Sequence, residues 1–162
     1  ELYALKLYIN DAIDADPNAV TQFPHATARL WDTSHSDTNH WHPRNAVDND
    51  LNTGWQTKYK TQMPQTIEID YGEEHTFNHL SLDVGFDEAW HYIHEATLSV
   101  MDANGWSKVA DVRHAGRGYE LDFSSTTCRL FKLEVTKANM LHLFNFKLSE
   151  VSKRQFRHKP LN

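Results

Sequence analysis

The chain has 162 residues, of which 40% are hydrophobic and 12% aromatic, so it can bury a core and is not a disordered composition. Its formal net charge of −6 argues against phosphate-dominated nucleic-acid binding and against an anionic membrane surface. No apolar run approaches the roughly 20 residues that span a bilayer, and the first residues do not show the basic-then-apolar pattern expected of a signal peptide. A single cysteine, Cys128, permits no disulfide within the chain.

The first 24 residues combine alternating apolar positions with a break at Asp14–Pro17. We interpret residues 1–24 as a lead-in strand or as a linker from a preceding domain, and we expect the domain itself to be residues 25–162. A short strand is predicted at Ala26–Trp31. The run His35–Pro43 is predicted to be a loop because it is rich in Ser, Asp, Asn and Pro.

The stretch Asn45–Trp55 gathers acidic, amide and hydroxyl side chains around a glycine. Asp48, Asp50 and Thr53 lie close together, and Gly54 follows them. Such residues favour a turn, since their side chains bond the nearby backbone or tolerate positive φ. Carboxylate, hydroxyl and carbonyl oxygens that converge in a turn are the ligands that Ca²⁺ takes. Two interpretations stay open here, a calcium-binding turn and a plain solvated turn.

Segments that alternate apolar and polar residues follow, and turn residues separate them. The sequence predicts a hairpin turn at Asp102–Gly105, where glycine supplies positive φ. It predicts strands at 66–71, 77–84, 96–101, 108–112, 119–123, 130–135 and 144–151. Between the first two, Gly72 with Glu73 and Glu74 is predicted to be a solvated turn. No long helix is apparent, so we expect an all-β antiparallel β-sandwich, a jelly roll of roughly eight strands.

Short motifs follow one another in a fixed order: Ala46-Val47-Asp48, Thr53-Gly54-Trp55, Ile67–Gly72, Asp102–Trp106, Arg129–Val135 and Ser149-Glu150-Val151. This series resembles the discoidin family, also called the coagulation factor (F5/8 type C) domain, and its relatives among bacterial carbohydrate-binding modules. The resemblance covers about residues 25–155. It implies a discoidin-like sandwich of the galactose-binding-like fold.

The resemblance also implies a set of calcium ligands. The ion would tie the long turn to the last strand in a structural role, and Ca²⁺ is the one cofactor expected. The ligands carried over from the family are Asn45 through its carbonyl, Asp48 through its carboxylate, Asp50 through either group, Thr53 through its hydroxyl and carbonyl, Ser149 through its carbonyl, and Glu150 through its carboxylate.

Aromatic residues in the predicted loops suggest a ligand-binding surface. Aromatic faces stack on the C–H patches of sugars, and amides and imidazoles bond sugar hydroxyls, but large aromatic surfaces also anchor protein ligands. In related modules the ligand lies in the mouth that these loops form. The segment Phe86–Trp90, where such modules often carry an arginine, has none, which argues against a galactose-type site but not against sugar binding. The candidate residues are His40, Trp41, Tyr59, Trp90, His91, Tyr92 and Asn139.

Catalysis is not indicated, because the chain has no G-x-S-x-G motif and no cysteine in a basic context. We expect a non-catalytic carbohydrate-binding module that binds a glycan and carries further domains of a secreted or surface glycan-processing protein. It would act outside the cell, in the periplasm or at the cell surface. The alternative is a protein-interaction or adhesion domain of the same fold without a sugar site.

Overall fold

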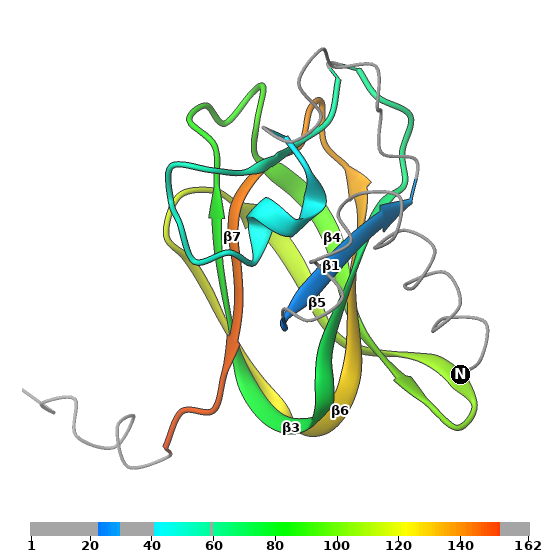
Figure 1. Cartoon of the computed structure of the whole chain (residues 1–162). Coiled ribbons are helices and arrows are strands. Elements are labelled where there is room, and N and C mark those ends of the chain that lie inside the picture. The colour runs from blue at the N-terminus through cyan, green and yellow to red at the C-terminus, as the bar shows by residue number, and fades with distance from the viewer. Residues whose placement is uncertain (1–22, 30–40, 59, 153–162) are drawn as a thin grey trace, which may run out of the picture.

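The computed structural model describes residues 23–29, 41–58 and 60–152. Most of the predicted lead-in segment therefore lies outside the described residues. Within them, one 3₁₀ helix and seven strands form (Figure 1). The elements are β1 (His25–Arg29), η2 (Pro43–Ala46), β2 (Trp55–Gln56), β3 (Gln65–Val84), β4 (Ile93–Asp102), β5 (Gly105–Ala115), β6 (Tyr119–Lys137) and β7 (His142–Ser149).

The strands form a single antiparallel sheet in the order β2-β7-β3-β6-β4-β5, with β1 paired to β3. Two long strands fold this sheet over itself. The first half of β3 pairs with β1, and its second half pairs with β7, while β6 follows β3 along both halves. Figure 1 shows both strands curving at the lower end of the molecule and rising on the other side. The result is a two-layered β-sandwich, which confirms the predicted all-β antiparallel fold.

The bend in β3 replaces the turn that was predicted after Gly72. The strand does not end there, since pairing with β6 continues after a register shift between Asp70 and His75. Gly72 has φ +80°, which glycine adopts at no steric cost. Its N–H donates to the buried Asp70 carboxylate at 2.7 Å, and Arg129 of β6 donates to the same carboxylate at 2.8 and 2.9 Å. A doubly bonded ion pair therefore holds the bend against the neighbouring strand.

Apolar positions of the strands fill the space between the two layers. Alternation along each strand turns every second side chain inward, as the sequence pattern indicated. Trp55 is fully buried beside the start of β7, and Cys128 is a buried free thiol. The largest side chains with no exposed area include Trp55, Ile67, Ile69, Leu80, Leu98, Phe131, Leu133 and Leu141.

The hairpin between β4 and β5 confirms the prediction at Asp102–Gly105. Asp102 pairs with Gly105, whose φ is +108°. The Asp102 carboxylate accepts the N–H of Asn104 at 2.8 Å and the hydroxyl of Ser107 at 2.6 Å. These bonds to charged oxygens hold the carboxyl pKa of Asp102 below its usual value.

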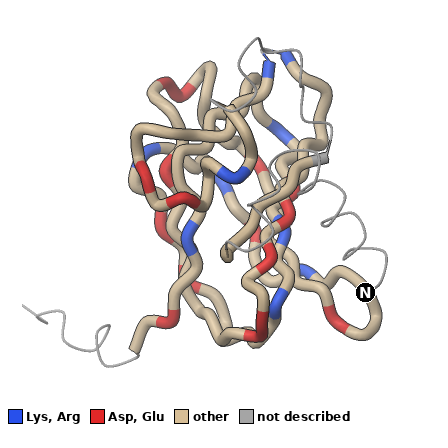
Figure 2. The backbone as a smooth tube through the Cα atoms, viewed as in Figure 1, with Lys and Arg blue, Asp and Glu red and all other residues tan. Residues whose placement is uncertain are grey.

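The described surface carries both signs of charge. In the view of Figure 2, lysine and arginine positions are scattered among aspartate and glutamate positions instead of gathering on one face. Among the residues that the structure describes, no helix is long and apolar enough to cross a membrane.

Candidate functional site

Three loops meet at one end of the sandwich, at the top of Figure 1. They are residues 57–64 before β3, 85–92 between β3 and β4, and 138–141 between β6 and β7. Asn139 ties them together, because its side-chain amide donates to the Ala89 carbonyl and its own carbonyl accepts the N–H of Lys60 at 2.9 Å. We call this end of the molecule, with Trp41 beside it, the mouth.

Loop 85–92 presents Trp90 to solvent. Asp87 organises the loop, since one of its carboxylate oxygens accepts the N–H of Ala89 at 2.8 Å and that of Trp90 at 3.2 Å. The Asp87 carbonyl then accepts the N–H of His91 at 2.8 Å. These bonds form a compact turn whose position is held, through Ala89, by Asn139. At its tip the Trp90 side chain is 50% exposed, so a well-anchored loop carries a half-exposed aromatic ring.

A cluster of rings lies beneath this loop, centred on His142 at the start of β7. His142 packs edge-on against Trp41 at 5.3 Å and against His91 at 5.6 Å between ring centroids. It also contacts Phe144 at 4.3 Å and Phe86 at 5.6 Å. The structure therefore brings Trp41 and His91, both predicted from the sequence, to the two sides of a histidine that was not predicted.

The His142 ring is buried in this cluster and has no polar partner within the described residues. Burial, together with the nearby His91 and Arg117, lowers the pKa of His142 to about 4. Within the described residues, neither ring nitrogen of His142 has a hydrogen-bond partner, and nor does Nδ1 of His91. Buried polar atoms without a partner are unusual in native proteins and identify groups that have hydrogen-bonding capacity left.

Arg117 supplies a positive charge that the loop sequence itself lacks. It comes from the turn between β5 and β6, and its guanidinium lies 5.5 Å from the ring centre of Phe86 and 5.6 Å from that of Phe144. Its Nε bonds the Asp83 carboxylate at 2.9 Å, while the side chain remains 48% exposed. Guanidinium groups stacked on aromatic rings are held flat and keep their other N–H groups for a ligand.

Tyr92, which was predicted to be a ligand residue, contacts the turn between β5 and β6. It is half-buried and packs on the backbone of Gly116, where an added Cβ would lie 2.3 Å from the tyrosine ring. The ring therefore fixes the β5–β6 turn that carries Arg117. His40 and Tyr59, the other two predicted ligand residues, lie outside the described residues.

Four mouth residues were missed by the sequence analysis: Phe86, Arg117, His142 and Phe144. Phe86 is 65% exposed in the same loop as Trp90, so the aromatic content of that loop was an available signal. Arg117 had no local signal, because only the pairing of β3 with β6 and β7 brings its turn beside Phe144.

In the turn that was predicted to bind calcium, the polar side chains bond to other residues of the same turn. The Asp48 carboxylate accepts the N–H of Asp50 at 2.9 Å and the hydroxyl of Thr53. Asp50 accepts the N–H of Asn52 on its carboxylate at 2.9 Å, and its carbonyl accepts both the N–H and the hydroxyl of Thr53. Asn45 donates from its amide to the Gly54 carbonyl at 3.4 Å. The structure thus brings three of the six predicted ligands, Asp48, Asp50 and Thr53, into direct contact, while Asn45 bonds the neighbouring Gly54.

Ser149 and Glu150 are not brought to this turn. The turn meets β7 at its start, where a Cβ on Gly54 would lie 3.2 Å from the Leu143 carbonyl. Ser149 pairs with His79 at the other end of β7, about 20 Å along the strand at 3.3 Å per residue. Glu150 lines a separate depression with Asn78 and Ser125. The last strand runs away from the turn, so its final acidic residue does not complete a cage there.

The remaining candidate ligands are still of the chemical type that calcium prefers. Two carboxylates, a hydroxyl and backbone carbonyls are hard oxygen ligands of the type that Ca²⁺ takes. In the part of the chain that the structure describes, no group of three or more His, Cys, Asp or Glu residues is placed to hold a metal ion. Calcium therefore stays a prediction that rests on Asp48, Asp50 and Thr53.

Solved structures with similar folds include carbohydrate-binding modules. CpGH89CBM32-5 from Clostridium perfringens, solved in complex with GalNAc-β-1,3-galactose, has a TM-score of 0.64 and 23% identity, covering 76% of this chain and 92% of that chain. The family 32 carbohydrate-binding module of C. perfringens NanJ, in complex with galactose, has a TM-score of 0.62 and 14% identity, covering 76% and 90%.

A third similar structure is chitosan-binding module 2 of a chitosanase/glucanase from Paenibacillus sp. IK-5, in complex with chitotriose. Its TM-score is 0.61 at 18% identity, covering 77% of this chain and 95% of that chain. At these identities the likeness shows a common fold.

The comparison with curated proteins gives no match. The model of the F5/8 type C domain matches residues 31–146, which is most of the chain. That match confirms the resemblance carried by the sequence motifs, and the chain belongs to the F5/8 type C domain family.

Proposed function

We propose that this chain is a non-catalytic carbohydrate-binding module and that the mouth holds its ligand. The observation that carries the proposal is the half-exposed ring of Trp90 on a loop fixed by Asp87 and Asn139. An exposed aromatic face on a rigid support is what stacking on a sugar ring requires.

Polar groups around Trp90 suit sugar hydroxyls. Within the described residues Nδ1 of His91 has no hydrogen-bond partner, and Arg117 has N–H groups beyond the one that bonds Asp83. A sugar placed on Trp90 would receive hydrogen bonds from these two sides. One stacking ring with a few hydrogen bonds gives weak binding, near millimolar to high micromolar, or about 4–6 kcal/mol.

The similar structures support this proposal through their own ligands. Each of the three described above was solved with a sugar or is a module from a glycan-degrading enzyme. Their sugars differ from one another, so they support a glycan as the ligand class and leave the individual sugar to experiment. A module of this kind would be one part of a larger secreted or surface glycan-processing protein.

Two aspartates near the mouth are engaged in structural bonds, which favours binding over hydrolysis. Asp83 is engaged by Arg117, and Asp87 is engaged by the backbone N–H groups of its own loop. Glycosidases need two carboxyl groups that face each other across the scissile bond, one of them free to donate a proton. These two aspartates serve structural bonds instead.

A glycan array tests the proposal when it is combined with hydrolysis assays on the sugars that bind. We expect binding to a restricted set of glycans and no release of product. Turnover of a bound glycan would contradict the non-catalytic assignment. An array without any binding would contradict the sugar-binding assignment and favour a protein-interaction domain of the same fold.

A further inference from the structure

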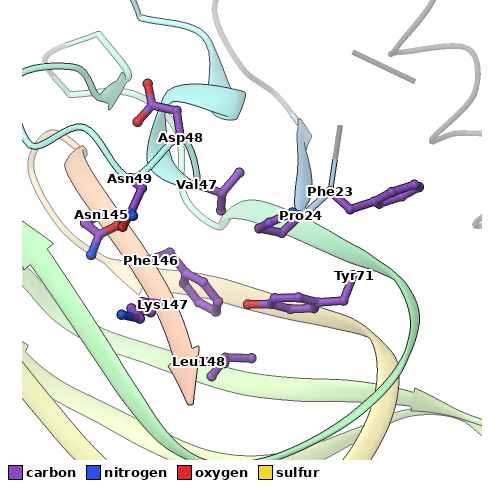
Figure 3. Close-up of a pocket in the computed structure, with 10 residues that line it drawn as sticks. All are labelled: Phe23, Pro24, Val47, Asp48, Asn49, Tyr71, Asn145, Phe146, Lys147 and Leu148. Carbon is purple, nitrogen blue, oxygen red and sulfur yellow. The ribbon is translucent and has the colours of Figure 1, made fainter. Parts of the chain in front are cut away.

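A second concave surface lies on the flank of the sandwich, away from the mouth (Figure 3). It encloses about 420 Å³. Its walls come from the residues before β1, the turn after η2, the middle of β3 and the second half of β7. Cavities that take small ligands measure roughly 300–1,000 Å³, so this groove is large enough for one or two sugar rings.

The groove exists because β7 has an open edge. β2 pairs only with His142 and Leu143, so beyond these residues the outer edge of β7 has no strand neighbour within the described residues. The turn after η2 stands beside that edge without pairing to it. A hollow remains between them, and strand edges left open in this way keep backbone and side-chain groups accessible.

Aromatic rings form one wall of the groove and are held rigidly. The Tyr71 ring packs against Phe77 at 4.9 Å and against Phe131 at 5.8 Å between centroids. Burial raises the pKa of the Tyr71 hydroxyl, which therefore stays protonated, and this hydroxyl is hydrogen-bonded to the backbone of Leu148. Figure 3 shows Tyr71 pointing toward Phe146 across the groove.

Polar side chains on the opposite side lack partners. Asn49, Asn145 and Lys147 make no side-chain hydrogen bond or ion pair within the part of the chain that the structure describes. Asn145 is half-buried, and Figure 3 shows its amide beside that of Asn49, with Lys147 next along the strand. Asp48 differs, because its carboxylate is bonded to the turn and points away from the groove. A half-buried amide without a partner, such as that of Asn145, is costly unless a ligand or water bonds it, whereas the Asn49 amide is exposed.

We propose that this groove is a second saccharide-binding site, independent of the mouth. The amides of Asn49 and Asn145 each offer a donor and an acceptor to neighbouring sugar hydroxyls, and Lys147 adds a cationic donor. The aromatic wall would cover the apolar face of the ring. The two sites lie on the same strand, since His142 belongs to the mouth and the groove begins at Asn145. They are about 10–20 Å apart along β7.

Nuclear magnetic resonance can observe both sites in one titration. The side-chain amide signals of Asn49 and Asn145 report on the groove, and the indole N–H of Trp90 reports on the mouth. The probes are galactose, N-acetylgalactosamine, glucosamine and galacturonic acid, each raised to about 10 mM because millimolar affinity is expected. Asn104, in the β4–β5 hairpin, supplies a control amide that should not move.

We expect at least one probe to shift the two groove amides with a saturable curve, and to do so equally in the Trp90→Ala protein. Asn145→Ala should weaken binding at the groove about five- to tenfold, as the loss of one hydrogen-bonding group predicts. Lys147→Gln removes the charge of an exposed side chain but keeps a polar end group, and should weaken binding less. Asn104→Ala should change nothing.

Two results would overturn the proposal. One is the absence of groove shifts with all four probes. The other is the disappearance of these shifts in Trp90→Ala, which would show that they are transmitted from the mouth. Groove shifts that persist while the Trp90 indole never responds would support the second site and contradict the proposed mouth, so the two proposals can fail separately.

Discussion

The turn at Asn45–Gly54 and the mouth are both built from loops, but they treat polar groups in opposite ways. In the turn, the carboxylates of Asp48 and Asp50 accept bonds from residues two to five positions away. In the mouth, His91 comes from loop 85–92 and His142 from the start of β7, and both leave ring nitrogens without partners in the described chain. A loop whose polar groups bond to one another is suited to a structural role. A region whose polar groups lack hydrogen-bond partners is suited to binding a ligand.

Trp55 joins the two regions and should give the largest effect on stability. It follows the turn directly, pairs with Leu143 of β7 and is fully buried. Trp55→Ala should lower the free energy of unfolding by about 3–5 kcal/mol, the usual cost of emptying an aromatic core site. Urea denaturation measures this. Trp106→Ala is the matched control, because Trp106 is only half-buried and stacks on Lys132 at 4.6 Å. Equal losses in the two variants would show that Trp55 is not a core residue.

Calcium should stabilise the turn and not the mouth, which would sharpen the contrast between the two regions. A ligand that binds only the native state adds about 2.7 kcal/mol at a concentration one hundred times its Kd. We expect the melting temperature to rise in calcium relative to chelator, and Asp48→Ala to remove the difference. Asp102→Ala is a close control, since Asp102 accepts an N–H two residues on and a hydroxyl five residues on, as Asp48 does. Identical melting in calcium and chelator would mean that the turn binds no calcium.

Lowering the pH should reduce the stability of the folded protein through His142, which lies in the mouth. Its pKa is about 4 in the folded chain and about 6.5 for an ordinary histidine. Above pH 6.5 neither state is protonated, so the group does not affect stability. As pH falls from 6.5 to 4, the unfolded chain binds a proton that the folded chain does not, and the free energy of unfolding falls. Thermal melts over this range should show a shallower decline for His142→Gln. The same slope in both proteins would mean that His142 is protonated in the native mouth.

Asn139 should give the smallest change in stability. Its amide donates one hydrogen bond to Ala89 from an exposed position, which is worth about 0.5–1.5 kcal/mol. Asn139→Asp keeps the shape and removes the donor, so loop 85–92 should exchange its amide hydrogens faster while the core does not. Unchanged exchange at Ala89–His91 would show that Asn139 does not fix this loop.

The fold could be predicted because its determinants are local. Alternation along 66–71 and 130–135, the Asp102–Gly105 turn and the motif order each identify an element from neighbouring residues. The joining of two predicted strands into β3 could not be predicted. It depends on the Asp70–Arg129 pair, whose members lie far apart in the sequence and meet only when β3 and β6 pair.

The mouth was predicted only in part for the same reason. Trp90, His91 and Asn139 were found by their aromatic or amide character in predicted loops, and the structure places them together. Arg117 and His142 reach the mouth through strand pairing, which composition does not reveal. The expectation that Glu150 would reach the turn assumed a strand register in which the last acidic residue faces it. In the structure, β7 carries that residue to the other end of the sandwich.

The central claim is that the Trp90 face binds sugar, and one titration tests it most directly. The glycan that binds most strongly on the array is titrated by calorimetry into wild type, Trp90→Ala and Trp106→Ala, with a melt of each protein. Trp90→Ala should lose most of the binding free energy of about 4–6 kcal/mol and keep the wild-type melting temperature, because its ring is half exposed. Trp106→Ala should bind like wild type. Full affinity in a folded Trp90→Ala protein would contradict the account and place the sugar site elsewhere.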